Sequence, residues 1–404
     1  MPRPERVELL KKIQDLRQSV VICYLTSLRT NVPSQMADDS VRVMFDHLLR
    51  VSQRPAKIKK LDIFLASNGG SGTVPWRLVS LFREFAKSIC VLIPYRAYSA
   101  ASLLALGADE IVMHPFGELG PIDPSVSNDF NPVDQSTGRR LGISVEDVRA
   151  YINFVKSGVG ITHEDELVKA LEILANKIHP LALGNVERFL LQSRMIAGKI
   201  LRTHMKNADD HTIKEIVENM ASKLYFHGHP INRKEAKSDL KLKVVEPPMD
   251  LEEVMWKLYM DFEQEFKNLT VFNPAEDLAA MPAPSTAPAV PPGASVPPTV
   301  AAPAAIPPGP KEKTYELVHA MIESEGLSSR HFTKRRYTHM GMVMTPAGPA
   351  PHILEELLEQ AWNHSAAAPA VPPPQPSSSG PAGAQAAVPK SAKKPARKPR
   401  RSKG

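Results

Sequence analysis

The sequence has little of what marks several classes of protein. Its 404 residues include only two cysteines, Cys23 and Cys90, and each lies in an apolar, strand-like run. Two isolated cysteines exclude a disulfide framework and match no metal-ligand spacing, so we expect reduced core thiols and no metal. No apolar run approaches the roughly 18 residues needed to cross a bilayer. We therefore expect no membrane span and a cytoplasmic protein.

Proline, in contrast, is abundant and unevenly distributed. Many of the 38 prolines lie in Asn273–Lys311 and Ser365–Val388, which otherwise contain mostly small residues. Such segments bury too little apolar surface to offset the entropy of the chain. The composition predicts a folded domain at 1–272, a Pro/Ala-rich linker at 273–311, a small helical island at 312–363 and a disordered tail at 364–404.

The end of the tail carries the positive charge of the chain. Lys390–Gly404 contains eight Lys or Arg and no acidic residue, and without these cations the formal net charge of +7 falls to about −1. The basic character therefore belongs to the tail and not to the folded surface. Two interpretations remain open: electrostatic binding of nucleic acid or another polyanion, and an end that only keeps the chain soluble.

The first 120 residues have the pattern of a parallel α/β protein. Continuous apolar runs predict strands at 20–25, 61–66, 89–93 and 110–113, and amphipathic segments predict helices at 39–51, 74–87 and 100–107. Because the runs do not alternate with polar residues, we expect strands that are covered on both faces of a mainly parallel sheet. From about residue 145 onward, the pattern becomes helical.

Two loops of this α/β region have features of a catalytic site. Gly69–Gly70 and Ser99 each follow a predicted strand, and the carboxyl ends of parallel strands share one edge of a sheet. A hydroxyl at a helix entrance and glycine amides open to a substrate oxygen resemble a nucleophile with an oxyanion hole. The alternative is that Ser99 only caps its helix. A nucleotide site is disfavoured, since Gly69–Gly72 lacks GxGxxG spacing and no Walker lysine follows.

Four segments carry a resemblance to a known family. They are Leu61–Gly70, Pro94–Ala101, Ala105–Met113 and Leu119–Pro124. The chain resembles, over about residues 7–266, the serine dehydrogenase proteinase family, which is grouped with the Clp protease proteolytic subunit and signal peptide peptidase A. The resemblance implies a ClpP/crotonase-like spiral of β-β-α and βα units with a mainly parallel sheet and a helical C-terminal half. The step from Ser99 to Asp109 aligns Ser99, and not Ser102, with the nucleophile of signal peptide peptidases.

The resemblance also implies a mechanism. Ser99 would attack a peptide carbonyl, and the amides near Gly69, Gly70 and Ala100 would hold the oxyanion. For the general base, Lys156 resembles the buried lysine of a Ser/Lys dyad. His114 is the alternative base, because the Clp proteolytic subunit uses a histidine.

The family resemblance leaves three functions open. The first is a cofactor-free serine peptidase that acts on peptide or protein substrates and assembles as a homo-oligomer. The second is a noncatalytic scaffold of the same fold that binds partners through residues 312–363 and the basic tail. The third is a crotonase-like acyl-CoA enzyme, which would share the oxyanion hole but would not need Ser99. Two departures from the family pattern, Asn68 before the glycines and Ala101 after the serine, bear on activity.

Overall fold

The structure of the chain is a computed structural model. The structure describes residues 4–122, 125–126, 129–134, 140–221, 228–282, 310–345 and 348–366. Residues Met1–Ala367 form one compact unit. Within the described ranges, no helix has the length and apolar content needed to span a bilayer. Lys390–Gly404 and most of the predicted linker lie outside the described residues.

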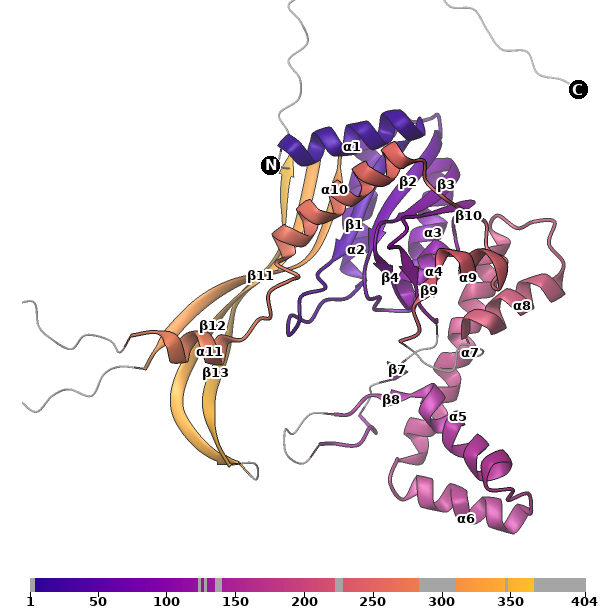
Figure 1. Ribbon diagram of the computed structural model, residues 1–404, viewed down its shortest axis with the longest axis vertical. Helices are drawn as coiled ribbons and strands as arrows, with labels where there is room; N and C mark the ends of the chain where they lie inside the picture. The colour runs from indigo at the N-terminus through magenta and orange to yellow at the C-terminus, as the bar shows by residue number, and fades with distance from the viewer. Residues whose placement is uncertain are drawn as a thin grey trace, which may run out of the picture. The chain divides into compact units, whose positions relative to one another are not determined.

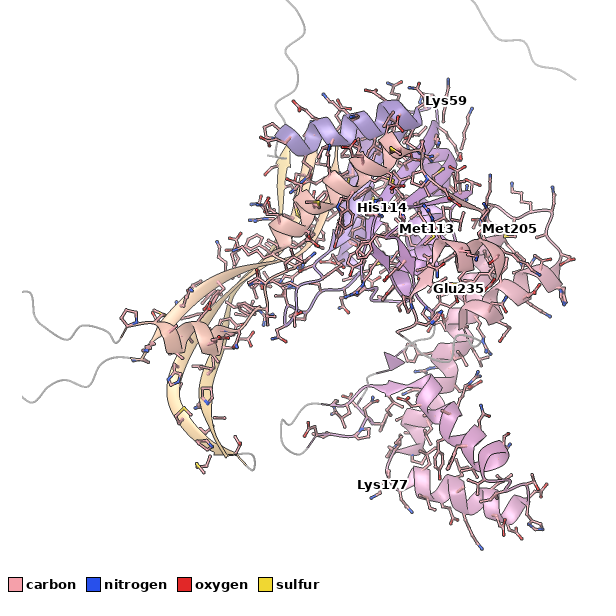
Figure 2. All side chains as sticks on the ribbon, in the orientation of Figure 1. Lys59, Met113, His114, Lys177, Met205 and Glu235 are labelled. Atoms are coloured by element: carbon pink, nitrogen blue, oxygen red, sulfur yellow. The ribbon has the colours of Figure 1, made fainter. Side chains whose placement is uncertain are left out.

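An eight-stranded sheet, with strand order β10-β5-β3-β2-β1-β11-β12-β13, forms the centre of the fold (Figure 1). Its parallel part consists of β1 (Val20–Thr26), β2 (Ile58–Ala66), β3 (Ala86–Ile93), β5 (Glu110–Met113) and β10 (Val244–Val245). In register, Ile63 pairs with Ile22 and Val91. Strand β5 ends at Met113, which His114 follows (Figure 2). The predicted α/β class with a mainly parallel sheet is confirmed.

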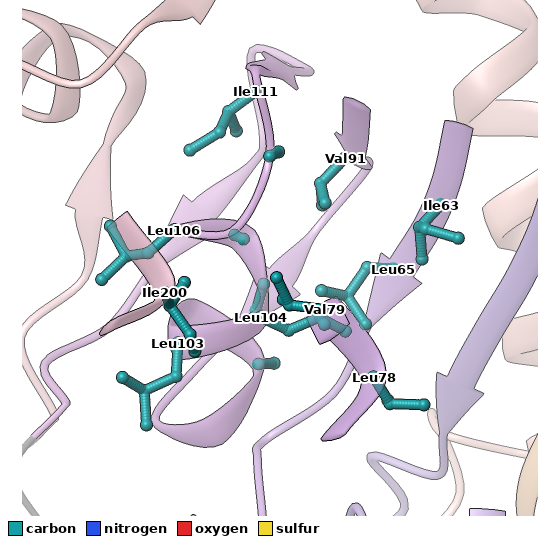
Figure 3. Packing of buried hydrophobic residues seen from close by; sticks show 14 of the residues in the cluster. Ile63, Leu65, Leu78, Val79, Val91, Leu103, Leu104, Leu106, Ile111 and Ile200 are labelled. Carbon is teal, nitrogen blue, oxygen red and sulfur yellow. The ribbon is translucent and has the colours of Figure 1, made fainter. Parts of the chain in front are cut away.

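Helices cover both faces of the parallel strands. One face carries α2 (Asp39–Val51), α3 (Val74–Phe85) and α4 (Ala100–Ala105). Helix α7 (Pro180–Arg202) packs against α3 and α4, and α8 (Asp210–Ala221) packs against α7. The other face carries α1 (Pro4–Arg17) and α10 (Met249–Phe266), which lie side by side (Figure 1). Successive side chains enter different cores: Ile63 and Leu65 pack toward α3 and α4 (Figure 3), whereas Phe64 packs with α10. This arrangement explains the continuous apolar runs of the strands.

The two cysteines are core residues. Cys23 and Cys90 are buried and form no disulfide. Burial raises the pKa of the Cys23 thiol well above its usual range and the pKa of Cys90 to about 12. Both thiols are therefore protonated and unreactive near neutral pH, as the sequence predicts.

The prediction of a small helical island at 312–363 is wrong. The segment forms three antiparallel strands, β11 (Glu312–Ser324), β12 (Leu327–Thr345) and β13 (Gly348–Ala366). Strand β11 pairs with β1, where Ile22 faces Ser324 and Thr26 faces Ala320. Without it, the backbone donors and acceptors along one side of the buried strand β1 would have no partner. This tertiary requirement overrides the helical spacing of the apolar residues.

The start of the predicted linker is also structured. Residues Pro274–Ala280 form α11, in which Leu278 is fully buried. Together with Phe272, Leu278 packs against Leu317 of β11 and Tyr337 of β12. The few apolar residues of this stretch are enough to dock one short helix onto the strands that the sequence analysis did not foresee.

Shorter elements surround the sheet. Strands β4 (Arg96–Ala97), β6 (Glu118–Leu119) and β9 (Ile231–Asn232) form a second sheet, and β7 (Ser125–Val126) pairs with β8 (Ile143–Ser144). The helices α5 (Val145–Asn153), α6 (Glu164–Ala175) and α9 (Arg233–Ser238) complete the described part, with a π-helix at Phe154–Gly158 after α5.

One buried arginine joins the N-terminal helix α1 to helix α10 and strand β11. Arg6 of α1 pairs with Asp261 of α10 and, at 2.8 Å, with Glu323 of β11. Its guanidinium also lies over the ring of Phe262, 4.1 Å from the centroid. The side chains of Arg6 and Glu323 are each only 2% exposed, so each neutralises a charge that water cannot reach.

Replacing Arg6 tests this connection. Arg6→Met would leave the Glu323 carboxylate buried without its cation, and we expect the free energy of unfolding to fall by about 3–5 kcal/mol. Arg42→Met is the control, because Arg42 forms an exposed pair with Asp46, and we expect a change below about 0.5 kcal/mol. Urea denaturation measures both. Equal stabilities of the two variants would contradict the role of Arg6.

Candidate active site

Ser99 lies in a strained turn between β4 and α4. Its φ of 52° and ψ of −116° are backbone angles that residues with a side chain rarely adopt. The turn is held by hydrogen bonds from the Tyr98 amide to the Ser67 carbonyl (2.9 Å) and from the Leu103 amide to the Ser99 carbonyl (3.0 Å). Although Ser99 occupies the N-cap position, its side chain makes no capping hydrogen bond. The strain thus has no structural benefit in capping, which points to a functional reason for the turn.

The Ser99 turn lies directly against the glycine loop. A Cβ atom on Gly69 would be 2.8 Å from the Cβ of Ser99 and 2.9 Å from the nitrogen of Ala100. Gly69 also has a φ of 96°, in the region that favours glycine. Only a residue without a side chain permits this approach. The two loops therefore meet at the carboxyl ends of the strands, as the sequence predicts.

A segment that the sequence analysis missed fixes Gly70. The Met36 amide donates to the Gly69 carbonyl (2.7 Å), and the Ser71 amide donates to the Met36 carbonyl (2.9 Å). A Cβ atom on Gly70 would be 2.5 Å from the backbone nitrogen of Met36 and 2.5 Å from its carbonyl oxygen. Because the contact involves backbone atoms only, no side-chain pattern in the sequence could have revealed it.

Of the backbone amides around Ser99, some already donate a hydrogen bond within the protein and others do not. The Gly69 amide donates to Ser67 Oγ (3.0 Å), which lies 2.7 Å from Thr26 Oγ1. By contrast, none of the hydrogen bonds among the described residues uses the amide of Gly70 or of Ala100. These two amides belong to the glycine loop and to the Ser99 turn, which meet at Gly69.

The second serine of this region has a structural role. Ser102 is fully buried, and its hydroxyl donates to the Ala97 carbonyl (2.6 Å) and accepts from the Gly120 amide (3.0 Å). It thereby ties α4 to the loop after β6. Ala101 is also fully buried, within the hydrophobic core, so its methyl group does not line the surface beside Ser99.

The structure places the two candidate bases in different surroundings. The ring of His114 stacks on Trp256 of α10, with 5.2 Å between centroids, and its Nδ1 accepts from the Phe116 amide (3.0 Å). Burial lowers the pKa of His114. Lys156 lies on the π-helix and is exposed, as are its neighbours Phe154 and Val159. Within the described residues, no hydrogen bond joins either candidate to Ser99, and no cluster of three or more His, Cys, Asp or Glu could hold a metal ion.

Two serine variants separate the structural hydroxyl from the free one. Ser102→Ala removes one buried acceptor and one buried donor, so we expect a loss of about 1–3 kcal/mol in the free energy of unfolding. Ser99→Ala removes no described hydrogen bond of the side chain, and we expect a change within about 0.5 kcal/mol. Chemical denaturation measures both. A larger loss in Ser99→Ala than in Ser102→Ala would contradict these assignments.

The chain is similar to several known proteins. Two uncharacterized proteins of Methanocaldococcus jannaschii match it: MJ1495, 30% identical over 81 residues (20% of this chain and 28% of that protein), and MJ0137, 25% identical over 128 residues (30% and 43%). The chain thus spans less than half the length of these relatives. Among solved structures, a mutant of the 1510-N membrane-bound stomatin-specific protease aligns with 57% of this chain and 82% of its own, at 14% identity and a TM-score of 0.32.

The family comparison covers the part of the chain that builds the site. Residues 5–136 match the family described as ClpP-like SDH-type serine proteinase. This range includes the parallel strands β1, β2, β3 and β5, the glycine loop and the Ser99 turn. The resemblance of the sequence to the serine dehydrogenase proteinase family is thereby confirmed over residues 5–136.

Proposed function

We propose that the protein is a serine peptidase in which Ser99 is the nucleophile. The observation that supports this most is the strained Ser99 turn pressed against Gly69, with the free amides of Gly70 and Ala100 beside it. A strained turn at a strand-to-helix junction presents a hydroxyl at the surface, where a substrate can reach it. Membership of residues 5–136 in a serine proteinase family supports the same conclusion.

The geometry suggests how a peptide bond would be cleaved. The Ser99 hydroxyl attacks the substrate carbonyl, loses its proton to a base, and forms a tetrahedral intermediate. The amides of Gly70 and Ala100 donate to the oxyanion, and α4 adds the positive end of its backbone dipoles. Gly69, whose own amide is engaged with Ser67, contributes by its missing side chain. The base returns its proton to the leaving nitrogen, so collapse of the intermediate breaks the C–N bond and releases the amine; water, deprotonated by the same base, then hydrolyses the acyl-enzyme and restores the Ser99 hydroxyl.

We propose Lys156 as the general base. A homo-oligomer would bury this lysine, which is exposed in the single chain. A lysine acts as a base near neutral pH only when burial favours its uncharged form. In a single chain Lys156 is exposed, but so are Phe154 (63%) and Val159 (54%) on either side of it, and Ile173 (61%) of the following helix α6. A second copy that covers these apolar side chains would also desolvate Lys156. A location in the cytoplasm and peptide or protein substrates belong to the same proposal.

One observation favours the scaffold as the alternative function. Within the described residues, no titratable side chain makes a hydrogen bond with the Ser99 hydroxyl, and a serine without a base is a weak nucleophile. A scaffold of this fold would use its surface strands and its tail for binding, with no need of the Ser99 hydroxyl. The two functions predict opposite behaviour toward a serine-directed reagent.

A fluorophosphonate probe decides between them. We expect the wild-type protein to be labelled, since the probe needs both an activated hydroxyl and an oxyanion hole. Labelling should vanish in Ser99→Ala and persist in Ser102→Ala. Gel fluorescence measures the labelling, and mass spectrometry locates the modified residue. No labelling of the wild type would favour the scaffold, and unchanged labelling of Ser99→Ala would reject Ser99.

A lysine variant tests the base. We expect Lys156→Ala to lower peptide hydrolysis by about 10²–10⁴-fold, the usual contribution of a general base. Lys237→Ala, at an exposed lysine of α9, is the matched control and should retain full activity. Size-exclusion chromatography with light scattering shows whether each variant keeps the assembly of the wild type. Full activity of Lys156→Ala would turn the search for the base to His114.

A further inference from the structure

A buried histidine of the C-terminal strands reaches the segment that holds Gly70. His319 lies in β11 and is only 6% exposed. Its Nδ1 is 2.8 Å from the carbonyl oxygen of Pro33, and its Nε2 is 2.8 Å from Thr333 Oγ1 on β12. The His319 carbonyl also accepts from the Ser27 amide (2.8 Å), just after β1. The imidazole therefore links two C-terminal strands to the loop that contains Pro33 and Met36.

The hydrogen bonds fix the state of this imidazole. A carbonyl oxygen only accepts hydrogen bonds, so Nδ1 carries a proton and donates a hydrogen bond to the Pro33 carbonyl. Nε2 is then free to accept from the Thr333 hydroxyl. Burial lowers the pKa of His319, which keeps the ring neutral and in this tautomer near neutral pH. Both ring nitrogens are thus used in binding the loop to the strands.

The loop has little other support at this point. A cavity of about 190 Å³ lies next to it, lined by Ser34 and Gln35 from the loop and by Thr333 and Trp362 from the C-terminal strands. The Ser34 hydroxyl is buried but has no hydrogen-bond partner in the described part of the chain. Across Pro33, Ser34 and Gln35, the only described hydrogen bond is therefore the one from His319. The side chains on either side of this segment, Val32 and Met36, are buried, so the segment is fixed by packing at its two ends and by His319 between them.

We propose that His319 is a positioning residue for the oxyanion hole. It holds Pro33, and three residues later the backbone of Met36 binds Gly69 and Ser71 on either side of Gly70. The direction of the Gly70 amide thus depends on a residue outside the family match of residues 5–136. The inference rests on the proposed function, in which this amide binds the oxyanion. It makes strands β11 and β12 a requirement of the site and not only an extension of the sheet.

Another buried histidine provides a matched control. His47 of α2 is fully buried, with Nδ1 2.7 Å from Ser324 Oγ and Nε2 2.9 Å from Ser329 Oγ. Like His319, it uses both ring nitrogens in buried hydrogen bonds, but its partners are Ser324 and Ser329 of the C-terminal strands, and it makes no described hydrogen bond with Pro33 or Met36. Replacing it should cost stability without moving the loop.

The experiment compares three variants of the full-length chain. His319→Leu removes the donor to Pro33, His319→Asn restores a donor close to the position of Nδ1, and His47→Leu is the control. Hydrogen exchange at the Met36 and Ser71 amides, followed by NMR, reports the loop without any need for activity. The rate of fluorophosphonate labelling reports the oxyanion hole. All measurements are made well below the thermal midpoint of each variant.

We expect His319→Leu to speed exchange of both amides and to slow labelling, each by at least about 10-fold, since small misplacements of reacting groups have effects of this size. His319→Asn should lie within about 3-fold of the wild type, and His47→Leu should match the wild type in both readouts despite a lower midpoint. Unchanged exchange or unchanged labelling in His319→Leu would overturn the proposal, as would equal effects of His47→Leu. If the wild type is not labelled, the proposed function fails, and the exchange rates alone then support or overturn the link from His319 to the loop.

Discussion

The approach of the Asn68–Gly70 backbone to the Tyr98–Ala100 turn is the constraint on which the rest of the site depends. At Gly69 no space is left for even one methyl group, because the nearest atoms of Tyr98, Ser99 and Ala100 lie within 3 Å of where a Cβ would be. Ser99 in turn accepts a strained backbone that only its surroundings can maintain. The parallel sheet provides those surroundings by ending β2 and β3 at one edge.

Polar contacts support this edge from two sides. On one side, Ser67 Oγ accepts from the Gly69 amide and from the Thr26 hydroxyl, which leaves the Gly70 amide as the loop donor with no described partner. On the other side, Met36 pairs with the loop, and His319 holds the segment before Met36. The candidate site is therefore assembled from the N-terminal α/β unit and from strands that begin about two hundred residues after β5. Arg6 reinforces the same association by binding Glu323 next to β1.

Much of the fold could be predicted from the sequence, because the parallel strands and their helices are specified locally. Helix α2 and strand β5 have the predicted bounds, since amphipathic spacing and continuous apolar runs are properties of the segment itself. Residues 312–363 were mispredicted for the opposite reason. Their apolar spacing favours a helix, whereas the unpaired edge of β1 requires a strand, and that requirement arises only once β1 is folded.

The sequence by itself determined the residue types of the candidate site, a serine at a helix entrance and two adjacent glycines after a strand, and the resemblance to the family whose model matches residues 5–136. Only the tertiary structure decided which groups are free to act. The hydroxyl of Ser102, one helical turn from Ser99, is occupied by two buried hydrogen bonds. The Gly69 amide is occupied by its hydrogen bond to Ser67 Oγ. The contributions of Met36 and His319 were likewise decided in three dimensions, because they act through backbone atoms and one buried imidazole, whose partners are set by strand pairing and not by neighbours in the sequence.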